Sequence, residues 1–241
     1  MRGFVDLHCH FVPGIDDGAP SEEEGLVMLE RLHALGFSTV VATPHMRPGR
    51  FDNEKADLVS AFEGMQPAVR SRSGLPEVAL SSEHFFDDVV YQRLLAGAAL
   101  PYPGGRAVLL EFWGNEFPET VQHRIFDLRQ RGLLTVIAHP ERYRCFWRSP
   151  EILERLVDSG AAALLDTAAL VGKYGRETKR CALELLELGV YHAACSDAHR
   201  VEDVVEVEKG MRVIGETYGD DELEYLFGRG PRAILAGERA E

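Results

Sequence analysis

Seven short runs of apolar, β-branched residues recur along the chain and predict seven strands. Nearly unbroken apolar character, rather than strict alternation, is typical of parallel strands that are covered on both faces. Longer amphipathic segments separate the runs, so strands and helices alternate. The predicted strands are residues 3–8, 38–44, 77–83, 107–112, 133–140, 161–167 and 190–197.

The amphipathic segments carry helix start and stop signals. Residues 21–36 open with Ser21 and have Glu24 three residues later, which is a capping-box pattern, and they close on a glycine. Residues 117–132 and 176–189 also end on glycine. Regular alternation of this kind predicts an α/β protein with parallel strands.

The most economical architecture is a single-domain, distorted (β/α)7 barrel that spans residues 1–241. An open, doubly wound sheet is the second possibility. No G-x-G-x-x-G motif follows a predicted strand, which weighs against a dinucleotide-binding fold.

Composition and charge narrow the function classes. The formal charge of −13 disfavours a nucleic-acid substrate. We find neither an apolar run of 18 residues nor a signal-peptide pattern, so we expect a soluble cytoplasmic protein without membrane insertion. C-x-x-C spacing is absent, which predicts buried, reduced thiols rather than a disulfide frame or zinc knuckle at Cys9, Cys145, Cys181 and Cys195.

Imidazole and carboxyl groups gather where the predicted strands end. In a barrel, the loops after the strands carry the chemistry. Six of the seven strands deliver a ligand-type side chain there, which is hard to attribute to chance. In an extended chain His8 and His10 point to the same side. The candidates are His8, His10, Asp16, Asp17, His45, Glu83, Glu111, His139, Asp197 and His199.

Four other histidines fall outside this pattern. His33 and His123 lie in predicted helices and His192 lies within a predicted strand, which favours surface or core roles. His84 follows Glu83 and should face the opposite way, so we expect it to be mainly structural.

The candidate set predicts a metal centre. Imidazole and carboxylate without thiolate suit Mn, Fe or Zn. The set is too large for one ion, so we expect two or three ions that share carboxylates. Such clusters lower the pKa of bound water to about 7 and clamp a phosphoryl group in an in-line displacement.

Two arginines closely follow two of these histidines in the sequence and could bind phosphate. They are Arg142, after His139, and Arg47, after His45. A solvated loop charge is equally compatible with either arginine alone, and Arg142 is the better candidate.

Several motifs resemble a known group of enzymes in order and spacing, from residue 4 to about residue 200. They are "DLHCH", "PGIDDG", "ATPH", "AHPERY", "ALVGKYG" and "SDAH". The sequence is similar to the polymerase-and-histidinol-phosphatase superfamily and, within it, to manganese-dependent bacterial protein-tyrosine phosphatases of the CpsB/YwqE type. "PGIDDG" and "AHPERY" point to that branch.

The resemblance implies a distorted (β/α)7 barrel with three metal ions and a phosphoryl-gripping Arg142. It also implies phosphotyrosine substrates on a tyrosine autokinase that controls capsule or exopolysaccharide export. The sequence departs from the family pattern at two places. "SSEHFF" replaces the glycine-rich segment that usually precedes the acidic residue of the third strand, and Asp166 stands where the family commonly has Asn. The implied ligand sets are His8, His10, Glu83 and Asp197; Glu83, Glu111 and His139; and Asp17, His45 and His199.

Other functions compete with this one. A cysteine-based phosphatase is excluded because no cysteine begins a C-x5-R loop. A phosphotyrosine suits the predicted chemistry, since its phenol leaving group has a pKa near 10. The alternatives are a small-molecule phosphomonoesterase such as a histidinol phosphatase, a non-phosphatase amidohydrolase, and a metal-stabilised docking module without turnover.

Overall fold

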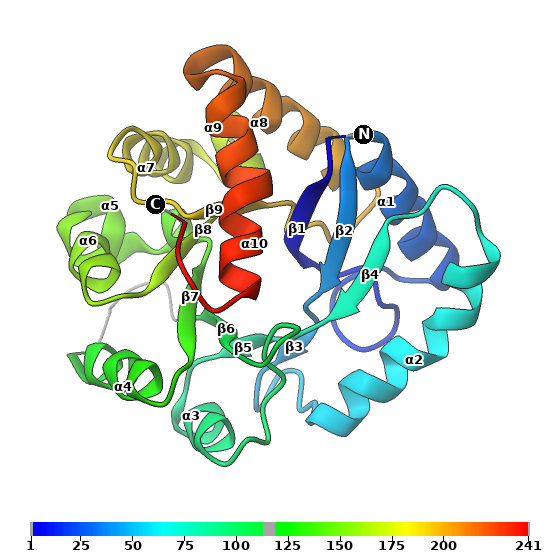
Figure 1. The fold of residues 1–241 in the computed structure, drawn as a ribbon, viewed down its shortest axis with the longest axis horizontal. Helices are drawn as coiled ribbons and strands as arrows, with labels where there is room; N and C mark the ends of the chain where they lie inside the picture. Colours follow the sequence, from blue (N-terminus) through cyan, green and yellow to red (C-terminus); the bar gives the residue numbers. More distant parts are fainter. Residues whose placement is uncertain (1, 113–118, 241) are drawn as a thin grey trace.

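The computed structural model describes residues 2–112 and 119–240. Its strands lie at the centre of the molecule and helices surround them (Figure 1). Neighbouring strands are parallel in both sheets. One sheet has the order β1 (Phe4–Cys9), β2 (Phe37–Ala42), β4 (Glu77–Leu80); the other has the order β3 (His45–Met46), β5 (Glu83–Phe85), β6 (Ala107–Glu111), β7 (Leu134–Ala138), β8 (Ala162–Asp166), β9 (Ala193–Cys195).

The two sheets join into a distorted barrel. The end of β1 meets the segment after β9, where the His10 N–H donates to the Ala198 carbonyl at 2.9 Å and the Asp197 N–H donates to the His8 carbonyl at 2.9 Å. The predicted α/β barrel class is therefore confirmed, and the carboxyl ends of β1 and β9 lie side by side.

Two predicted strands are each split in two, which corrects the expected count of seven. The run 38–44 breaks at Pro44, which lacks an N–H for the ladder, and resumes as β3 against β5. The run 77–83 breaks at Ser81 and Ser82, whose hydroxyls bond the carbonyls of Leu100 and Pro44. The two resumed segments pair with each other, with His45 opposite Glu83.

The helices cover the outside of the barrel. Ser21 caps α1 by accepting a hydrogen bond from the Glu24 N–H at 3.2 Å, as the capping pattern predicts. Residues 117 and 118 of the predicted helix 117–132 lie outside the described residues. The helices are α1 (Glu22–Ala34), α2 (Lys55–Ser71), α3 (Asp88–Leu95), α4 (Glu119–Gln130), α5 (Arg144–Arg148), α6 (Glu151–Asp158), α7 (Arg176–Glu187), α8 (Asp203–Tyr218), α9 (Asp220–Glu224) and α10 (Gly230–Leu235), with short turns η1 (Pro140–Arg142), η2 (Thr167–Val171) and η3 (Tyr225–Arg229).

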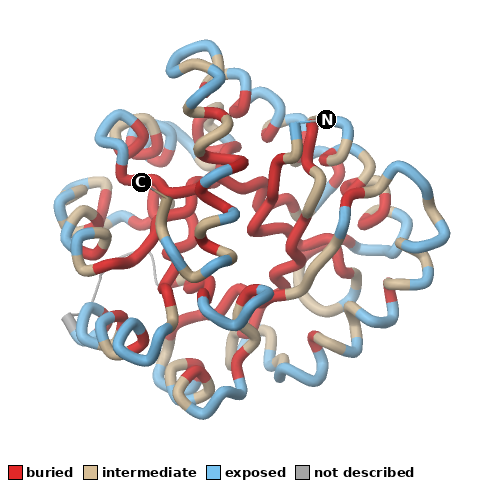
Figure 2. Tube along the Cα trace, viewed as in Figure 1, coloured by how far each residue is buried: buried red, intermediate tan, exposed pale blue. Residues whose placement is uncertain are grey.

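Apolar side chains fill the barrel and also the layer between strands and helices, which leaves the strands buried (Figure 2). Ile234 of α10 packs in the interior cluster with Val5 and Ala193, near the starts of β1 and β9. The C-terminal helices therefore close the amino end of the barrel. None of the helices in the described part of the chain has the length and apolar character needed to span a bilayer.

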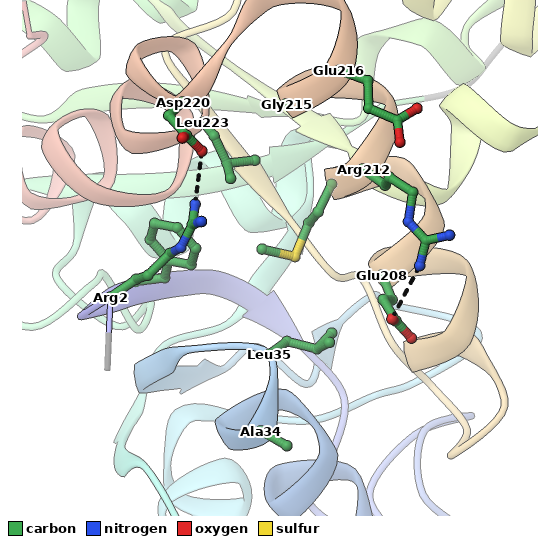
Figure 3. Close-up of a pocket in the computed structure, with 11 residues that line it drawn as sticks. Arg2, Ala34, Leu35, Glu208, Arg212, Gly215, Glu216, Asp220 and Leu223 are labelled. Atoms are coloured by element: carbon green, nitrogen blue, oxygen red, sulfur yellow. Dashed lines mark hydrogen bonds and ion pairs between the residues drawn. The ribbon is translucent and has the colours of Figure 1, made fainter.

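A hollow of about 400 Å³ lies at this amino end, beside Phe4, Met211 and Leu223 (Figure 3). Two ion pairs lie at its rim: Arg2 bonds Asp220 at 3.1 Å, and Arg212 bonds Glu208 at 3.4 Å. The opposite, carboxyl end of the barrel holds the ligand-type side chains.

Candidate metal centre

All nine predicted metal ligands converge at the carboxyl end of the barrel. Five are almost fully buried there: His8, His10, Glu83, His139 and Asp197. The others lie nearer the surface, with side-chain exposures of 9% for His45, 18% for Glu111, 26% for His199 and 40% for Asp17. The centre thus has a buried floor and a partly open mouth.

Glu83, at the start of β5, lies in the middle of the floor. One carboxylate oxygen is 2.8 Å from His139 Nε2 and 3.6 Å from His8 Nε2. The other is 3.0 Å from His45 Nδ1 and 3.5 Å from His10 Nε2. A carboxylate whose two oxygens face separate imidazole pairs has the geometry of a bridging ligand.

Asp197 and Asp17 extend the cluster from the floor to the mouth. Asp197 Oδ1 is 2.9 Å from His8 Nε2 and 3.5 Å from His10 Nε2. Asp17 Oδ1 is 3.4 Å from His45 Nε2 and 3.6 Å from His199 Nε2. Asp197 Oδ1 also lies 3.7 Å from His199 Nδ1, so His199 lies between the two aspartates.

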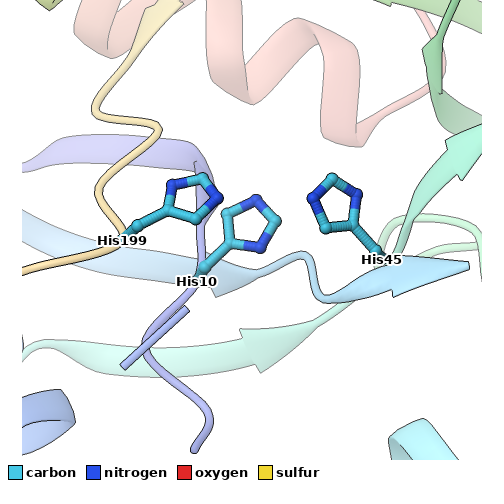
Figure 4. A group of neighbouring side chains, drawn as sticks. All are labelled: His10, His45 and His199. Carbon is cyan, nitrogen blue, oxygen red and sulfur yellow. The ribbon is translucent and has the colours of Figure 1, made fainter. Parts of the chain in front are cut away.

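Three histidine rings from separate segments meet at the mouth (Figure 4). The His10 ring stacks on the His199 ring with centroids 4.0 Å apart, and it lies 4.8 Å from the His45 ring. At the edge of the cluster, Glu111 Oε2 is 3.9 Å from His45 Nδ1 and 3.6 Å from an Arg47 nitrogen.

Four triads of side chains each bring their ligand atoms within 4.8 Å of one another. One of them lies within the first ligand set that the sequence resemblance implies. Another two divide the implied second set, because Glu83 groups with His139 through His8 and with Glu111 through His45. The triads are His8/His10/Asp197, His8/Glu83/His139, His45/Glu83/Glu111 and His10/His45/His199.

The donor set has the character of a cation site. Among the described residues, seven of the nine predicted ligands have a buried polar atom that makes no hydrogen bond. Buried polar atoms of this kind cost free energy unless something satisfies them. A divalent cation would do so for His8 Nε2, His10 Nε2, Asp17 Oδ1, His45 Nδ1, Glu111 Oε2, His139 Nδ1 and Asp197 Oδ1.

Hydrogen bonds behind the ligands orient two of the rings. Thr43 Oγ1 is 2.6 Å from His8 Nδ1, and Asp16 Oδ2 is 2.8 Å from His10 Nδ1. Both contacts leave Nε2 facing the centre, an arrangement typical of metal-binding histidines. Asp16 was among the candidates, although it lies behind a ligand, whereas Thr43 was not expected. Its only signal in the sequence is its position near the end of the predicted strand 38–44.

The backbone is strained where two ligands project. His139 has φ 33° and Asp197 has φ 41°, both in the left-handed region that non-glycine residues rarely adopt. Such residues cluster at functional sites because the surrounding structure holds them. Gly18 allows the chain to approach closely, since a Cβ there would lie 2.3 Å from the His10 carbonyl oxygen.

Burial and neighbouring charges set the protonation of the cluster. Burial alone would raise the pKa of Glu83, but His8 and His45 hold that pKa well below its usual value. Burial likewise opposes charge on His10, yet Asp16 raises the pKa of His10 well above its usual value. Burial and the Glu83 charge raise the pKa of Glu111 to about 7. The surroundings therefore favour charge on Glu83 and His10 and disfavour it on Glu111.

The two predicted phosphate-binding arginines lie beside the cluster. Arg142 Nη2 donates to Asp166, to Asp197 and, at 2.7 Å, to the Tyr174 hydroxyl. The Arg47 guanidinium lies 4.2 Å from the Phe85 ring centroid. Both arginines thus border the carboxylates of the centre.

The remaining histidines have the structural roles that we expected. His84 is fully buried and both ring nitrogens bond backbone groups, at Leu109 and Leu100. His192 lies just before β9 rather than within it, and accepts from the Ala163 N–H. His33 bonds the Phe37 carbonyl, and His123 is exposed on α4. Of the four cysteines, only Cys145 departs from expectation, because it is partly exposed.

The sequence is similar to a known family and to curated members of it. The family model for capsular polysaccharide synthesis, CpsB/CapC, matches residues 4–236. Tyrosine-protein phosphatase YwqE of Bacillus subtilis is 29% identical over 235 residues, which cover 97% of this chain and 92% of that protein. Tyrosine-protein phosphatase CpsB of Streptococcus pneumoniae is 23% identical over 96% of this chain and 98% of that protein.

Two solved structures are similar to this chain in fold. A chain from the crystal structures of YwqE and CpsB, described as unique metal-dependent tyrosine phosphatases, is 29% identical with a TM-score of 0.87; the match covers 98% of this chain and 96% of that chain. A lactonase from Listeria monocytogenes, 12% identical with a TM-score of 0.60, covers 100% of this chain and 96% of its own; it shares the fold.

Proposed function

The chain belongs to the capsular polysaccharide synthesis family CpsB/CapC, and on that premise we propose that it is a metal-dependent protein-tyrosine phosphatase. The observation that carries this proposal is the set of buried imidazole and carboxylate atoms without hydrogen bonds at the barrel mouth. A protein that only used the fold as a docking module would have little reason to maintain so many unsatisfied polar atoms.

We infer that two or three divalent ions bind there, with Mn²⁺ the first choice and Fe or Zn as alternatives. Such ions supply Lewis acidity, which acidifies water and neutralises phosphoryl oxygens. The proposed ligands are His8, His10, Asp17, His45, Glu83, Glu111, His139, Asp197 and His199.

The protein's own groups position the substrate. The guanidinium of Arg142 would donate to the phosphoryl oxygens, and Arg47, which lies 3.6 Å from Glu111, would add a second cation. Thr43 and Asp16 hold His8 and His10 in their ring orientations. A phenol leaving group, with a pKa near 10, requires less protonation than an alkyl alcohol, which favours phosphotyrosine.

The proposed partner is a phosphotyrosine-bearing protein, and a bacterial tyrosine autokinase of capsule or exopolysaccharide synthesis is the preferred candidate. The capsule-synthesis family and the phosphatase names of the relatives support this choice. The net charge of −13 disfavours nucleic acid as a substrate.

A phosphopeptide assay tests the proposal. Protein treated with chelator should be inactive on a phosphotyrosine peptide and should recover when Mn²⁺ is added. His8→Ala and Arg142→Ala should each lower kcat/KM by at least about a hundredfold, whereas the surface variant His123→Ala should match the wild type. Equal rates in all four proteins would refute the proposal. Faster turnover of amino-alcohol phosphates than of the peptide would instead indicate a small-molecule phosphomonoesterase.

A further inference from the structure

Arg142 shares its positive charge between two carboxylates. Its Nη2 donates to Asp166 and to Asp197, and its guanidinium carbon lies 3.9 Å from the Tyr174 ring centroid. The side chain keeps 24% of its surface exposed at the mouth of the centre. A phosphate that reaches Arg142 therefore meets a cation that is already paired.

Asp166 is a fixed partner in this arrangement. It is fully buried, its Oδ1 accepts from the Ala168 N–H at 2.9 Å, and its own N–H donates to Glu141 at 2.9 Å. If Arg142 moved away, the Asp166 carboxylate would be a buried charge without a cation, which is strongly unfavourable. Arg142 should therefore remain paired with Asp166 when a ligand binds.

The second carboxylate, that of Asp197, belongs to the cation cluster. Asp197 lies 2.9 Å from His8 Nε2 within the cation cluster, so bound cations would draw its charge. Asp166 forms no ion pair with any of the nine proposed ligands in the described part of the chain, where its ion-pair partner is Arg142. The negative charge of Asp166 thus persists behind Arg142 in the loaded protein.

On the basis of the proposed function, we propose that Asp166 acts through Arg142: its charge weakens the hold of Arg142 on phosphate and so favours product release. Across a guanidinium, two anions lie roughly 6 Å apart, and at an effective dielectric constant between about 20 and 80 a unit charge changes affinity by about three- to a hundredfold. We expect about a tenfold effect.

The test is Asp166→Asn. An asparagine side chain offers one acceptor oxygen, so it cannot serve both the Ala168 N–H and Arg142. Isothermal titration of Mn²⁺-loaded protein with inorganic phosphate should show a Kd about tenfold lower than in the wild type. The KM for a phosphotyrosine peptide should fall in parallel, without an increase in kcat.

Asp127→Asn is the matched control. Asp127 of α4 accepts from the Tyr91 hydroxyl at 2.6 Å and pairs with Arg131, just after the helix, at 3.5 Å. The variant therefore makes the same change in net charge and loses similar contacts. Its phosphate Kd should equal that of the wild type.

The direction of the change in phosphate Kd distinguishes the proposed role of Asp166 from a purely structural one. A purely structural role for Asp166 would make phosphate binding weaker on substitution, so an unchanged or higher Kd overturns the inference. If Asp166→Asn does not fold, Asp166→Ala provides the same comparison. A wild type that binds phosphate but does not hydrolyse the peptide would refute the proposed function alone, because the phosphate titration does not depend on turnover.

Discussion

Replacing Thr43 by valine tests how the centre depends on residues behind its ligands. The Thr43 hydroxyl oxygen contacts His8 Nδ1 at 2.6 Å and accepts from the Cys9 N–H at 3.2 Å. Valine has nearly the same shape, so the variant removes two hydrogen bonds with little change in packing. His8 would lose the contact that orients its ring, and the buried Cys9 N–H would lose its acceptor.

The structure sets the size of the effect. An unsatisfied buried donor costs about 1–3 kcal/mol, so the free energy of unfolding of chelated protein should fall by about 2 kcal/mol. For a chain of this length that corresponds to a decrease in Tm of about 4–8 °C. Loss of the hydrogen bond behind a ligating histidine typically lowers metal affinity by about 10- to 100-fold.

Thr135→Val is the matched control. The Thr135 hydroxyl is buried in β7 and makes no hydrogen bond with any described residue, so its removal should leave stability unchanged or raise it. Mn²⁺ affinity by competition with a chelating dye, and Tm by calorimetry, measure both effects. If Thr43→Val binds Mn²⁺ as tightly as the wild type, or if both variants lose affinity equally, Thr43 does not support the centre through His8.

Three further predictions follow from the same structure. Burial, aided by Asp166, raises the pKa of Glu141 from 4.5 to about 8. The stability that Glu141 contributes is therefore present below pH 4.5 and is lost as the pH rises toward 8. The Tm of Glu141→Gln relative to wild type should increase across that pH window, and a constant difference in Tm would contradict the shift. Gly18→Ala should lower Mn²⁺ affinity in dye competition because its Cβ would meet the His10 carbonyl oxygen. Gly14→Ala, with open space around it, should keep that affinity despite a positive φ of 75°. Equal affinities of the two variants would show that the close approach at Gly18 is unimportant. Each Mn²⁺ ion, at a hundred times its Kd, should stabilise the protein by about 2.7 kcal/mol, so Tm should rise by at least about 5–10 °C over chelated protein. An unchanged Tm would mean that the ion does not bind the folded state.

Local sequence signals were sufficient for the barrel because each strand is covered on both faces and reads as an apolar run. They were insufficient for strand boundaries, since Pro44 and the Ser81–Ser82 pair interrupt ladders in ways that depend on partner strands. The start of α1 could be predicted because its cap is a local contact between Ser21 and the Glu24 N–H.

The ligand-type residues could be identified in advance because parallel strands all present their carboxyl ends at one rim. The groups behind them could not. Asp16 reaches His10 across a turn, and Thr43 reaches His8 from a neighbouring strand, so both contacts exist only after folding. The pairing of Arg142 with Asp166 is likewise a contact between separate loops, which no spacing rule predicts.

Anomalous diffraction from crystals grown with Mn²⁺, with data collected on both sides of the manganese edge, would locate the metal ions themselves. We expect two or three manganese peaks at the carboxyl end of the barrel, with Glu83 between them and His8, His10 and Asp197 around one of them. An absence of peaks among these side chains at saturating Mn²⁺, or peaks only elsewhere on the protein, would contradict the proposed metal centre.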